Sequence, residues 1–270
     1  MPEDFRRINQ NVEYGKTALA AQRLKDAGFY EEPDGYALAG YYSKPGVEKR
    51  LIIGRDTPIN KGVYVGASER EAVVVDDQKD EHLHTAYGDL LIALGKLRDQ
   101  YRTATETILQ EVYQLVLKKI PYNAEMADRI MQAAGSNDGR VALGSYITSH
   151  GGVCRHEALL AGYLIERLIG DGKIGNETLG EFGRVSVDRN AIHGKGGHAW
   201  VRYEDDKNQV WVIDAAQQYC GRLDDVPEEA WFYERLPQTV EAEKNNSQQP
   251  PVADPKRGML DALRKLIGRL

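Results

Sequence analysis

The chain has 270 residues, of which 41% are hydrophobic and 28% charged, a balance typical of a globular protein that buries a core without disulfide or metal support. Its 41 acidic and 35 basic residues give a formal net charge of −6, which argues against a dedicated nucleic-acid-binding protein because such proteins carry a basic surface. Only two cysteines, Cys154 and Cys220, are present. They exclude a disulfide scaffold and are typical of a reducing compartment.

The N-terminal residues contain no basic stretch followed by an apolar core, so they do not resemble a secretory signal. No apolar run approaches the roughly 20 residues that are needed to cross a bilayer. We therefore expect a soluble cytoplasmic protein that has no membrane span.

The first 80 residues predict a helix followed by a small β-rich subdomain. An apolar stripe favours a helix over residues 11–27, which Gly28 can end. Four short β-type runs come next and predict one antiparallel sheet of three or four strands. These runs are residues 36–42, 51–53, 63–65 and 72–75.

The middle of the chain is predominantly helical in pattern. Apolar residues recur at helical spacing over residues 87–120, with a break expected near Gly95 or residues 103–105 because an unbroken helix of that length is unusual. A shorter helix is predicted over residues 124–134. Residues 141–148 fit either a strand or a helix.

A broadly apolar helix is predicted over residues 154–169, and its composition indicates deep burial. Three strands are predicted after it, over residues 182–187, 198–203 and 210–213. A polar connection joins the last two strands, which is typical of a hairpin.

These patterns divide the chain into four segments. We predict an N-terminal helix plus antiparallel β subdomain over residues 1–80 and a catalytic domain over residues 81–237. A flexible, proline-bearing linker over residues 238–256 and an amphipathic helix over residues 257–270 follow. The amphipathic helix is expected to pack against protein, within the chain or in a homodimer, rather than on a membrane surface.

Cys154 is the candidate nucleophile because it follows two glycines and begins the apolar helix. A helix N-terminus offers unpaired N–H groups and a partial positive charge, which favour a thiolate and can hold an oxyanion. His198, at the start of a predicted strand, is the candidate base, and Asp214, at the end of the next strand, is the candidate orienting acid. A hairpin would place these two strand ends side by side, so that the imidazole could bond Asp214 through one nitrogen and Cys154 through the other.

The segments GGVC, GHAWV and VWVID that contain these three residues resemble the transglutaminase-like superfamily of papain-like cysteine enzymes. The resemblance covers residues 122–216, and Cys154, His198 and Asp214 match the catalytic positions of the family. It implies an α+β fold with a papain-like core, in which the nucleophile helix packs on a small antiparallel sheet. The acid is followed here by Ala215 and Ala216, where the family often has a Pro-Thr-like turn.

The resemblance implies a cysteine peptidase that hydrolyses amide bonds of a peptide or protein substrate through a thioacyl intermediate, with no cofactor. The same triad serves transglutaminase-type acyl transfer to an amine, and the same fold serves non-catalytic scaffolds, so both alternatives stay open. A second oxyanion donor is needed beside the Cys154 N–H, and we favour Tyr122 over Asn123 and His150.

Other assignments compete for the same residues. Asp188 and Asn190 are rival orienting groups for the imidazole. A zinc site is the sharpest competing chemistry, but the sequence has neither CxxC nor HExxH spacing. Cys220 is interpreted as a structural cysteine. The residues that could in principle supply zinc ligands are Cys154, His156, His193, His198 and Asp214.

Overall fold

The structure is a computed structural model, and it describes residues 30–33, 40–44, 47–54, 57–65, 70–98, 104–134, 140–175, 183–192, 196–226 and 233. The chain forms two compact units, Met1–Phe232 and Tyr233–Leu270, and the elements below belong to the first. The helix predicted over residues 11–27, the linker over 238–256 and the helix over 257–270 lie outside the described residues. The four-segment division of the chain therefore stays a prediction.

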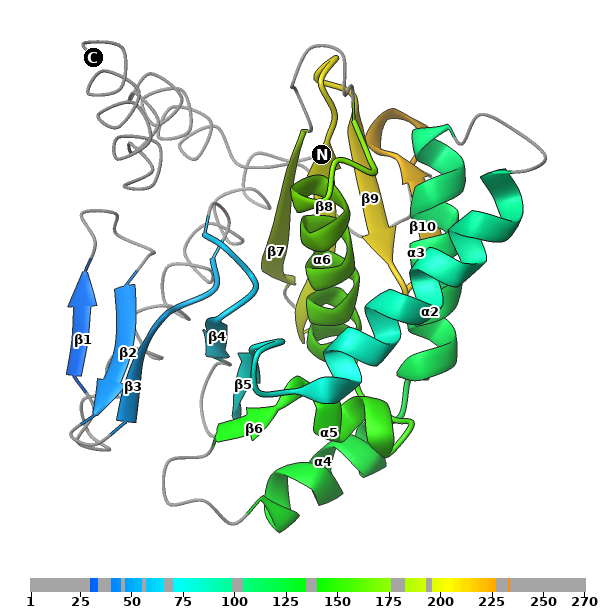
Figure 1. The fold of residues 1–270 in the computed structure, drawn as a ribbon. Coiled ribbons are helices and arrows are strands. Elements are labelled where there is room, and N and C mark those ends of the chain that lie inside the picture. The colour runs from blue at the N-terminus through cyan, green and yellow to red at the C-terminus, as the bar shows by residue number, and fades with distance from the viewer. Residues whose placement is uncertain are drawn as a thin grey trace, which may run out of the picture. The chain divides into compact units, whose positions relative to one another are not determined.

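The first sheet is antiparallel and contains β1 (Tyr30–Pro33), β2 (Gly40–Lys44) and β3 (Val47–Leu51), in that spatial order (Figure 1). Lys44 pairs with Val47 where β2 and β3 meet. β1 was not predicted.

A second sheet holds β4 (Gly62–Val65), β5 (Ala72–Val75) and β6 (Arg140–Ala142), and β5 pairs with β6 in parallel. The prediction of one antiparallel sheet over the first 80 residues is therefore wrong. The strands belong to two sheets, and a strand from much later in the chain completes the second. The reason is that β4 and β5 are buried and apolar, and a two-stranded ribbon cannot by itself satisfy a buried edge.

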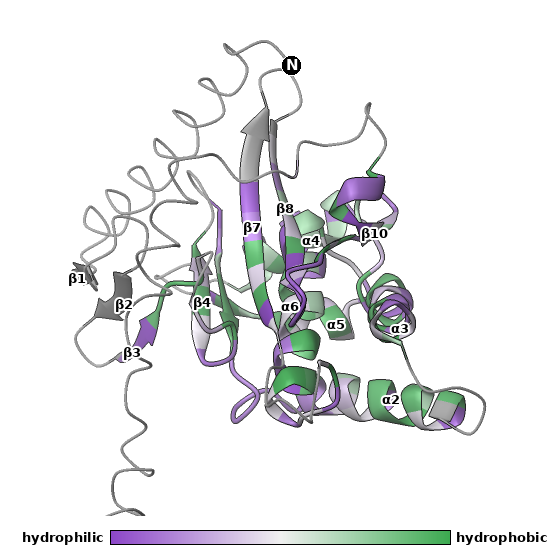
Figure 2. Cartoon of the chain, turned by 90° about the horizontal axis from the view of Figure 1, so that it is seen from above, coloured by the Kyte–Doolittle hydropathy of each residue, from purple (hydrophilic) through white to green (hydrophobic). Residues whose placement is uncertain are grey.

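The predicted long helical segment consists of two helices, α2 (Glu81–Arg98) and α3 (Thr105–Lys119), so the expected break is confirmed. Figure 2 shows hydrophilic and hydrophobic residues alternating around both helices, as expected for helices with one face on the core. The predicted short helix is confirmed as α4 (Ala124–Ala133), where the Asn123 side chain accepts a hydrogen bond from the Met126 N–H at 2.9 Å.

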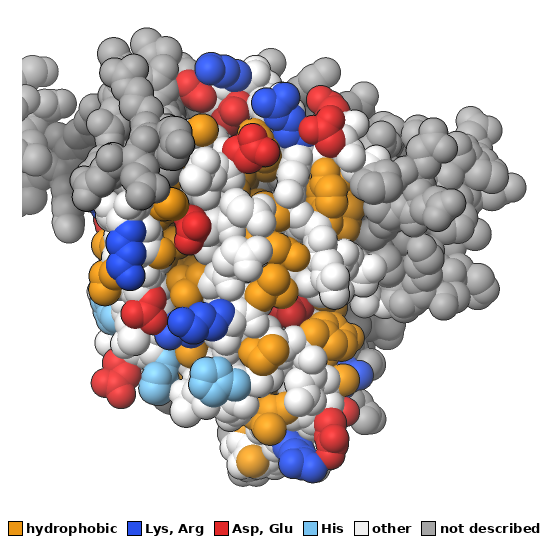
Figure 3. Space-filling view, turned by 90° about the vertical axis from the view of Figure 1, so that its right-hand side faces the viewer, with side chains coloured by type: hydrophobic (Ala, Val, Ile, Leu, Met, Phe, Trp, Pro, Cys, Tyr) orange, Lys and Arg blue, Asp and Glu red, His pale blue; other side chains and the backbone are white. Residues whose placement is uncertain are grey.

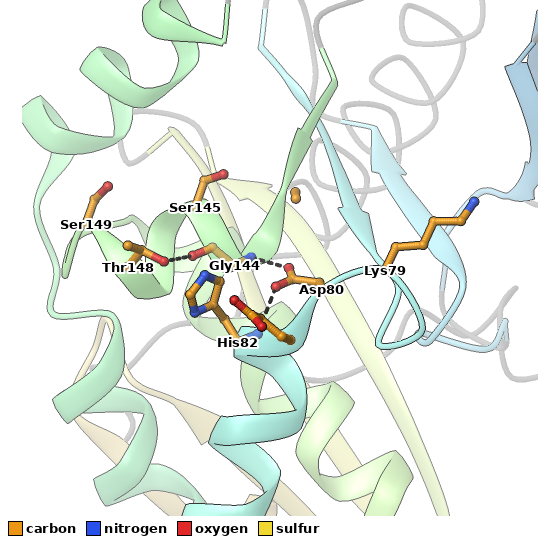
Figure 4. Close-up of a pocket in the computed structure, with 9 residues that line it drawn as sticks. Lys79, Asp80, His82, Gly144, Ser145, Thr148 and Ser149 are labelled. Carbon is orange, nitrogen blue, oxygen red and sulfur yellow. Dashed lines mark hydrogen bonds between the residues drawn. The ribbon is translucent and has the colours of Figure 1, made fainter.

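The ambiguous segment 141–148 contains both structures, because β6 leads directly into α5 (Leu143–Thr148). Asp80 joins the start of α5 to the start of α2: its two carboxylate oxygens accept the Gly144 N–H at 2.7 Å and the His82 N–H at 3.2 Å (Figure 4). A Cβ atom on Gly144 would lie 2.2 Å from Asp80 Oδ1, so this approach requires glycine.

The predicted buried helix is confirmed as α6 (Cys154–Gly170). It lies on a four-stranded antiparallel sheet of order β10-β9-β8-β7 (Figure 1). Three strands match the predicted ones, although β7 extends further, and β10 was not predicted. The strands are β7 (Arg184–Ile192), β8 (Gly196–Glu204), β9 (Val210–Asp214) and β10 (Tyr219–Arg222), and a short 3-10 helix, Leu223–Asp225, follows them.

One large hydrophobic core joins helices α2–α6 to strands β4–β9 and has α6 at its centre. The core includes Leu160 and Leu164 of α6, Val73 of β5, Val201 of β8 and Ile213 of β9. The expected α+β class is confirmed over the described residues by five helices, two three-stranded sheets, one antiparallel and one mixed, and an antiparallel four-stranded sheet. Among the described residues, no helix combines the length and hydrophobicity required to cross a bilayer.

Candidate active site

Cys154 is the first residue of α6 and is half-buried. The segment before it is tied to residues 121–123: the Gly152 N–H donates to the Pro121 carbonyl at 3.2 Å, and the Asn123 N–H donates to the Gly152 carbonyl at 2.7 Å. A Cβ atom on Gly152 would lie 2.6 Å from Ile120 Cγ2. Glycine at this position thus allows two distant segments to meet next to the sulfur.

A buried polar cluster fixes the first turn of α6. The Val153 N–H donates to His156 Nδ1 at 3.0 Å, so the His156 proton resides on Nε2, which lies 2.7 Å from Glu71 Oε1. Burial, together with the Arg155 charge, lowers the pKa of His156 to about 4, despite the Glu71 carboxylate. His156 is therefore neutral near pH 7 and acts as a hydrogen-bonding link between α6 and Glu71.

Glu71, which directly precedes β5, is the anion of this cluster. Its Oε1 atom also accepts a hydrogen bond from Arg155 Nε at 2.7 Å and forms an ion pair with Arg155 Nη2 at 2.6 Å. Burial acts to raise the pKa of Glu71, but its His156 hydrogen bond and the Arg155 charge lower it to about 2. The Tyr146 ring stacks on His156 with centroids 3.6 Å apart. The helix turn that carries Cys154 is thereby anchored to a residue far away in sequence.

His198 and Asp214 meet at the ends of neighbouring strands, as the predicted hairpin requires. His198 Nε2 lies 2.5 Å from Asp214 Oδ2, and both residues are buried. The second oxygen of Asp214 accepts the Gln217 N–H at 3.1 Å, which fixes the carboxylate in the turn after β9. Both oxygens of Asp214 are thus engaged, and one of them orients the imidazole.

The Cys154 side chain is close enough to His198 to act on the charge of the imidazole. Because Asp214 occupies Nε2, the nitrogen left for the sulfur is Nδ1. Burial acts to lower the pKa of His198, but the hydrogen bonds and negative charges of Asp214 and Cys154 raise it to about 9. The site therefore favours a protonated imidazole at His198.

Tyr122 lies beside this site. It forms an isolated parallel bridge with Gly152, and its side chain is 60% exposed. Partial burial, with smaller contributions from Cys154 and Glu157, raises the pKa of its hydroxyl. Tyr122 therefore stays protonated near pH 7 and keeps an O–H to donate, close to the sulfur.

The rival residues are placed differently. Asp188 is buried and accepts a hydrogen bond from Ser186 at 2.9 Å, whereas the described partner of His198 Nε2 is Asp214. The side chain of Asn190 lies outside the described residues. Asn123 uses its side-chain oxygen to cap α4, and His150 is an exposed residue with a φ of 48° after α5.

The zinc alternative finds no geometric support in the described part of the chain. Over those residues no group of three or more His, Cys, Asp or Glu side chains is arranged to hold a metal ion. His156 is bonded to Glu71 and Val153, away from the sulfur, and His193 lies outside the described residues.

Cys220 lies on β10 and is also a free thiol. Burial, with a smaller contribution from Glu106, raises its pKa to about 12. A thiol with such a pKa is almost entirely protonated near pH 7 and reacts slowly, because the thiolate is the nucleophile.

Two acidic residues near the nucleophile were missed. Glu157 follows Cys154 by three positions, so helical spacing alone places it on the same side of α6 and could have identified it. Glu71 carried no local signal, because its partners Arg155 and His156 lie far along the chain and meet it only in the folded protein.

A separate pocket of about 570 Å³ lies between the starts of α2 and α5 (Figure 4). None of the predicted site residues lines it. Its central carboxylate, Asp80, is occupied by the backbone N–H groups of Gly144 and His82, and the Thr148 hydroxyl donates to the Gly144 carbonyl at 2.8 Å. These polar groups are engaged in hydrogen bonds at helix ends. The candidate reactive groups are therefore those around Cys154.

The face of the molecule drawn in Figure 3 mixes Lys and Arg with Asp, Glu and hydrophobic side chains. Over its described residues we see no broad basic area of the kind that neutralises a phosphate backbone. The expectation that the protein does not bind nucleic acid stays a prediction.

Comparisons with known proteins returned no match: no protein-family model, no curated protein and no solved structure is similar to this chain at a significant level.

Proposed function

We propose that the protein is a cysteine peptidase that hydrolyses amide bonds in peptide or protein substrates, built on a papain-like core. The single observation that carries this proposal is the meeting of Cys154, His198 and Asp214: His198 Nε2 lies 2.5 Å from Asp214 Oδ2, and Cys154 is close enough to act on the charge of the imidazole. A half-buried cysteine at the start of a long helix supports it, because the sulfur is both accessible and next to a positive helix end.

In the first half of the reaction, the Cys154 sulfur attacks the carbonyl carbon of the scissile amide and forms a C–S bond. The carbonyl electron pair moves to oxygen, which gives a tetrahedral oxyanion. His198 then donates its Nδ1 proton to the departing nitrogen, the C–N bond breaks, and the amine leaves. Asp214 holds the ring throughout, so that Nδ1 faces the sulfur.

In the second half, His198 Nδ1 accepts a proton from water while the water oxygen attacks the thioester carbon. The C–S bond breaks, the carboxylic acid product leaves, and the thiolate and imidazolium are restored. Transfer to an amine would use the same intermediate, with the amine in place of water.

The oxyanion needs hydrogen-bond donors that are in place before the reaction. The N–H groups of the first helical turn have no acceptor within the helix, so the Cys154 N–H can serve. The Tyr122 hydroxyl supplies the second donor in this proposal, because its backbone is bridged to Gly152 and its side chain is influenced by the Cys154 charge.

Changing Tyr122 to phenylalanine should therefore lower kcat by about 100-fold with little change in KM, which is the scale expected for the loss of one oxyanion donor. The measurement is steady-state cleavage of a fluorogenic peptide. Tyr87→Phe is the matched control, because the Tyr87 hydroxyl bonds Asp171, close to the other end of α6. An unchanged kcat in Tyr122→Phe would show that Tyr122 is not the donor.

Alkylation tests the proposal directly. Near pH 7, iodoacetamide should modify Cys154 at least about 100-fold faster than Cys220, because the Cys220 thiol has a pKa of about 12 and is hardly ionised. The measurement is the rate of modification at each cysteine by peptide mass spectrometry, in parallel with the cleavage of a peptide library. Activity should fall in step with the modification of Cys154.

Three outcomes separate the alternatives. Cleavage that survives full modification of Cys154 would overturn the proposal. Incorporation of a labelled amine into a glutamine peptide, without peptide cleavage, would identify acyl transfer instead. Equal modification rates at Cys154 and Cys220, with neither reaction detected, would identify a non-catalytic protein.

A further inference from the structure

Glu157 is a buried carboxyl group that the mechanism above does not use. It lies on α6 one helical turn after Cys154, and only 1% of its surface is exposed. Within the described part of the chain, neither of its carboxylate oxygens has a hydrogen-bond partner. Buried polar groups are nearly always hydrogen bonded, because leaving one unpaired destabilises the fold. Such a cost in the wall of a reactive site suggests a role in the chemistry.

Titratable groups from several elements of the site interact electrostatically with Glu157. Asp214 and His198 act on its charge, with opposite signs. Glu157 in turn acts on the hydroxyls of two tyrosines, one on α3 and one in the segment before α4. The titratable neighbours are Cys154 on α6, Tyr113 on α3, Tyr122 before α4, His198 on β8 and Asp214 on β9.

We propose that Glu157 is a positioning residue that controls the charge of His198: its buried, unpartnered carboxylate keeps the imidazole protonated to higher pH. This inference rests on the proposed function, since it concerns the same thiolate–imidazolium pair.

The direction in which Glu157 shifts the pKa of His198 follows from the charges of the two groups. At low pH a neutral Glu157 adds no repulsion to the Asp214 carboxylate, which explains how a second buried acid is tolerated beside it. Burial, and next the Asp214 charge, raise the pKa of Glu157 to about 7, while His198 acts to lower it. Above that pH the Glu157 carboxylate adds a second negative charge next to the imidazolium, so His198 loses its proton at a higher pH than it would with Asp214 alone.

The test is an NMR titration of His198 in the full chain, labelled with ¹³C and ¹⁵N at histidine and assigned by the signal lost in His198→Gln. The wild type should show its own transition near pH 9 and a smaller inflection near pH 7 from Glu157. In Glu157→Gln the inflection should vanish, and the apparent pKa of His198 should fall by about half a unit or more, which is a threefold change in the ionisation constant.

Two further variants keep the test decisive. Glu157→Met has a similar volume and no group to leave unpaired, so it should fold and give the same titration as Glu157→Gln. Glu166→Gln is the matched control on the same helix, because Glu166 accepts the backbone N–H groups of Ile59 and Asn60 instead. Its His198 curve should match the wild type.

The same variants should shift the alkaline limb of kcat/KM to lower pH by the amount measured in the titration. A merely structural Glu157 would change stability and leave both curves in place, which would overturn the inference. If the titration changes as expected but the wild type cleaves no peptide, the charge coupling stands and the proposed function fails, so the two failures are distinguishable.

Discussion

Replacing Cys154 with alanine should lower peptide hydrolysis by about 10⁴-fold or more, because Cys154 is the group that forms the thioester in the proposed mechanism. The variant keeps the backbone N–H groups and the His198–Asp214 pair, so substrate binding should change little. The measurement is kcat/KM for the best peptide from the library, with binding to the inactive variant followed by isothermal titration calorimetry.

Cys220→Ala is the matched control, because Cys220 is the other free thiol of the chain and lies on β10, on the strand next to that of Asp214. Its activity should stay within about twofold of the wild type, since its protonated thiol has no role in the reaction. A Cys154→Ala protein that cleaves peptides as fast as the parent would contradict the mechanism, whatever Cys220→Ala does.

Replacing Glu71 with alanine should reduce the free energy of unfolding by about 3–5 kcal/mol, the usual cost of removing one partner from a buried ion pair. The loss leaves Arg155 with a charge that is largely buried and His156 with an unpaired Nε2–H. That amount is a large share of the ~5–15 kcal/mol that stabilises a typical protein. Urea unfolding at pH 7, followed by the fluorescence of the buried Trp200 and Trp211, measures it.

Glu125→Ala provides the control, because Glu125 pairs with Arg129 on the exposed face of α4, where an ion pair contributes only about 0.3–0.5 kcal/mol. Equal losses in the two variants would contradict the anchoring role of Glu71. Glu71→Gln keeps an acceptor for His156 and should lose less than Glu71→Ala.

The pH dependence of the free energy of unfolding in acid provides a second test of the Glu71 cluster. The pKa of Glu71 is about 2 in the folded protein, below its usual value of 4.5, so the unfolded chain binds this proton first as the pH falls. The wild type therefore has the full contribution of Glu71 above about pH 4.5 and loses it towards pH 2. The variants Glu71→Ala and Glu71→Gln should lack that part of the pH dependence.

Much of the local structure could be predicted from short stretches of sequence. The start of α6 at Cys154 follows from two glycines before an apolar run, and the break between α2 and α3 follows from the length of the helical pattern. The candidate triad could be proposed because His198 and Asp214 lie on two strands of one hairpin, near the ends away from its turn. A hairpin sets the register of its two strands, so it places these two residues close together.

Other features depend on partners that are distant in sequence. The strands predicted as one sheet belong to two, and β6 completes the second of these by pairing with β5 in parallel. β10 was missed because Tyr219–Arg222 contains only half-buried or exposed positions and therefore lacks a strong apolar pattern.

The candidate residues can be identified from the sequence, since the helix start, the strand ends and the turn chemistry are each encoded within about ten neighbouring residues. The charges of those residues depend on the folded protein. Hydrogen bonds and charges from distant segments raise the pKa of His198 and lower that of Glu71, in both cases against the effect of burial, whereas burial, and next the Asp214 charge, raise the pKa of Glu157. Desolvation and ion pairing depend on what packs against a group, and no local pattern contains that information.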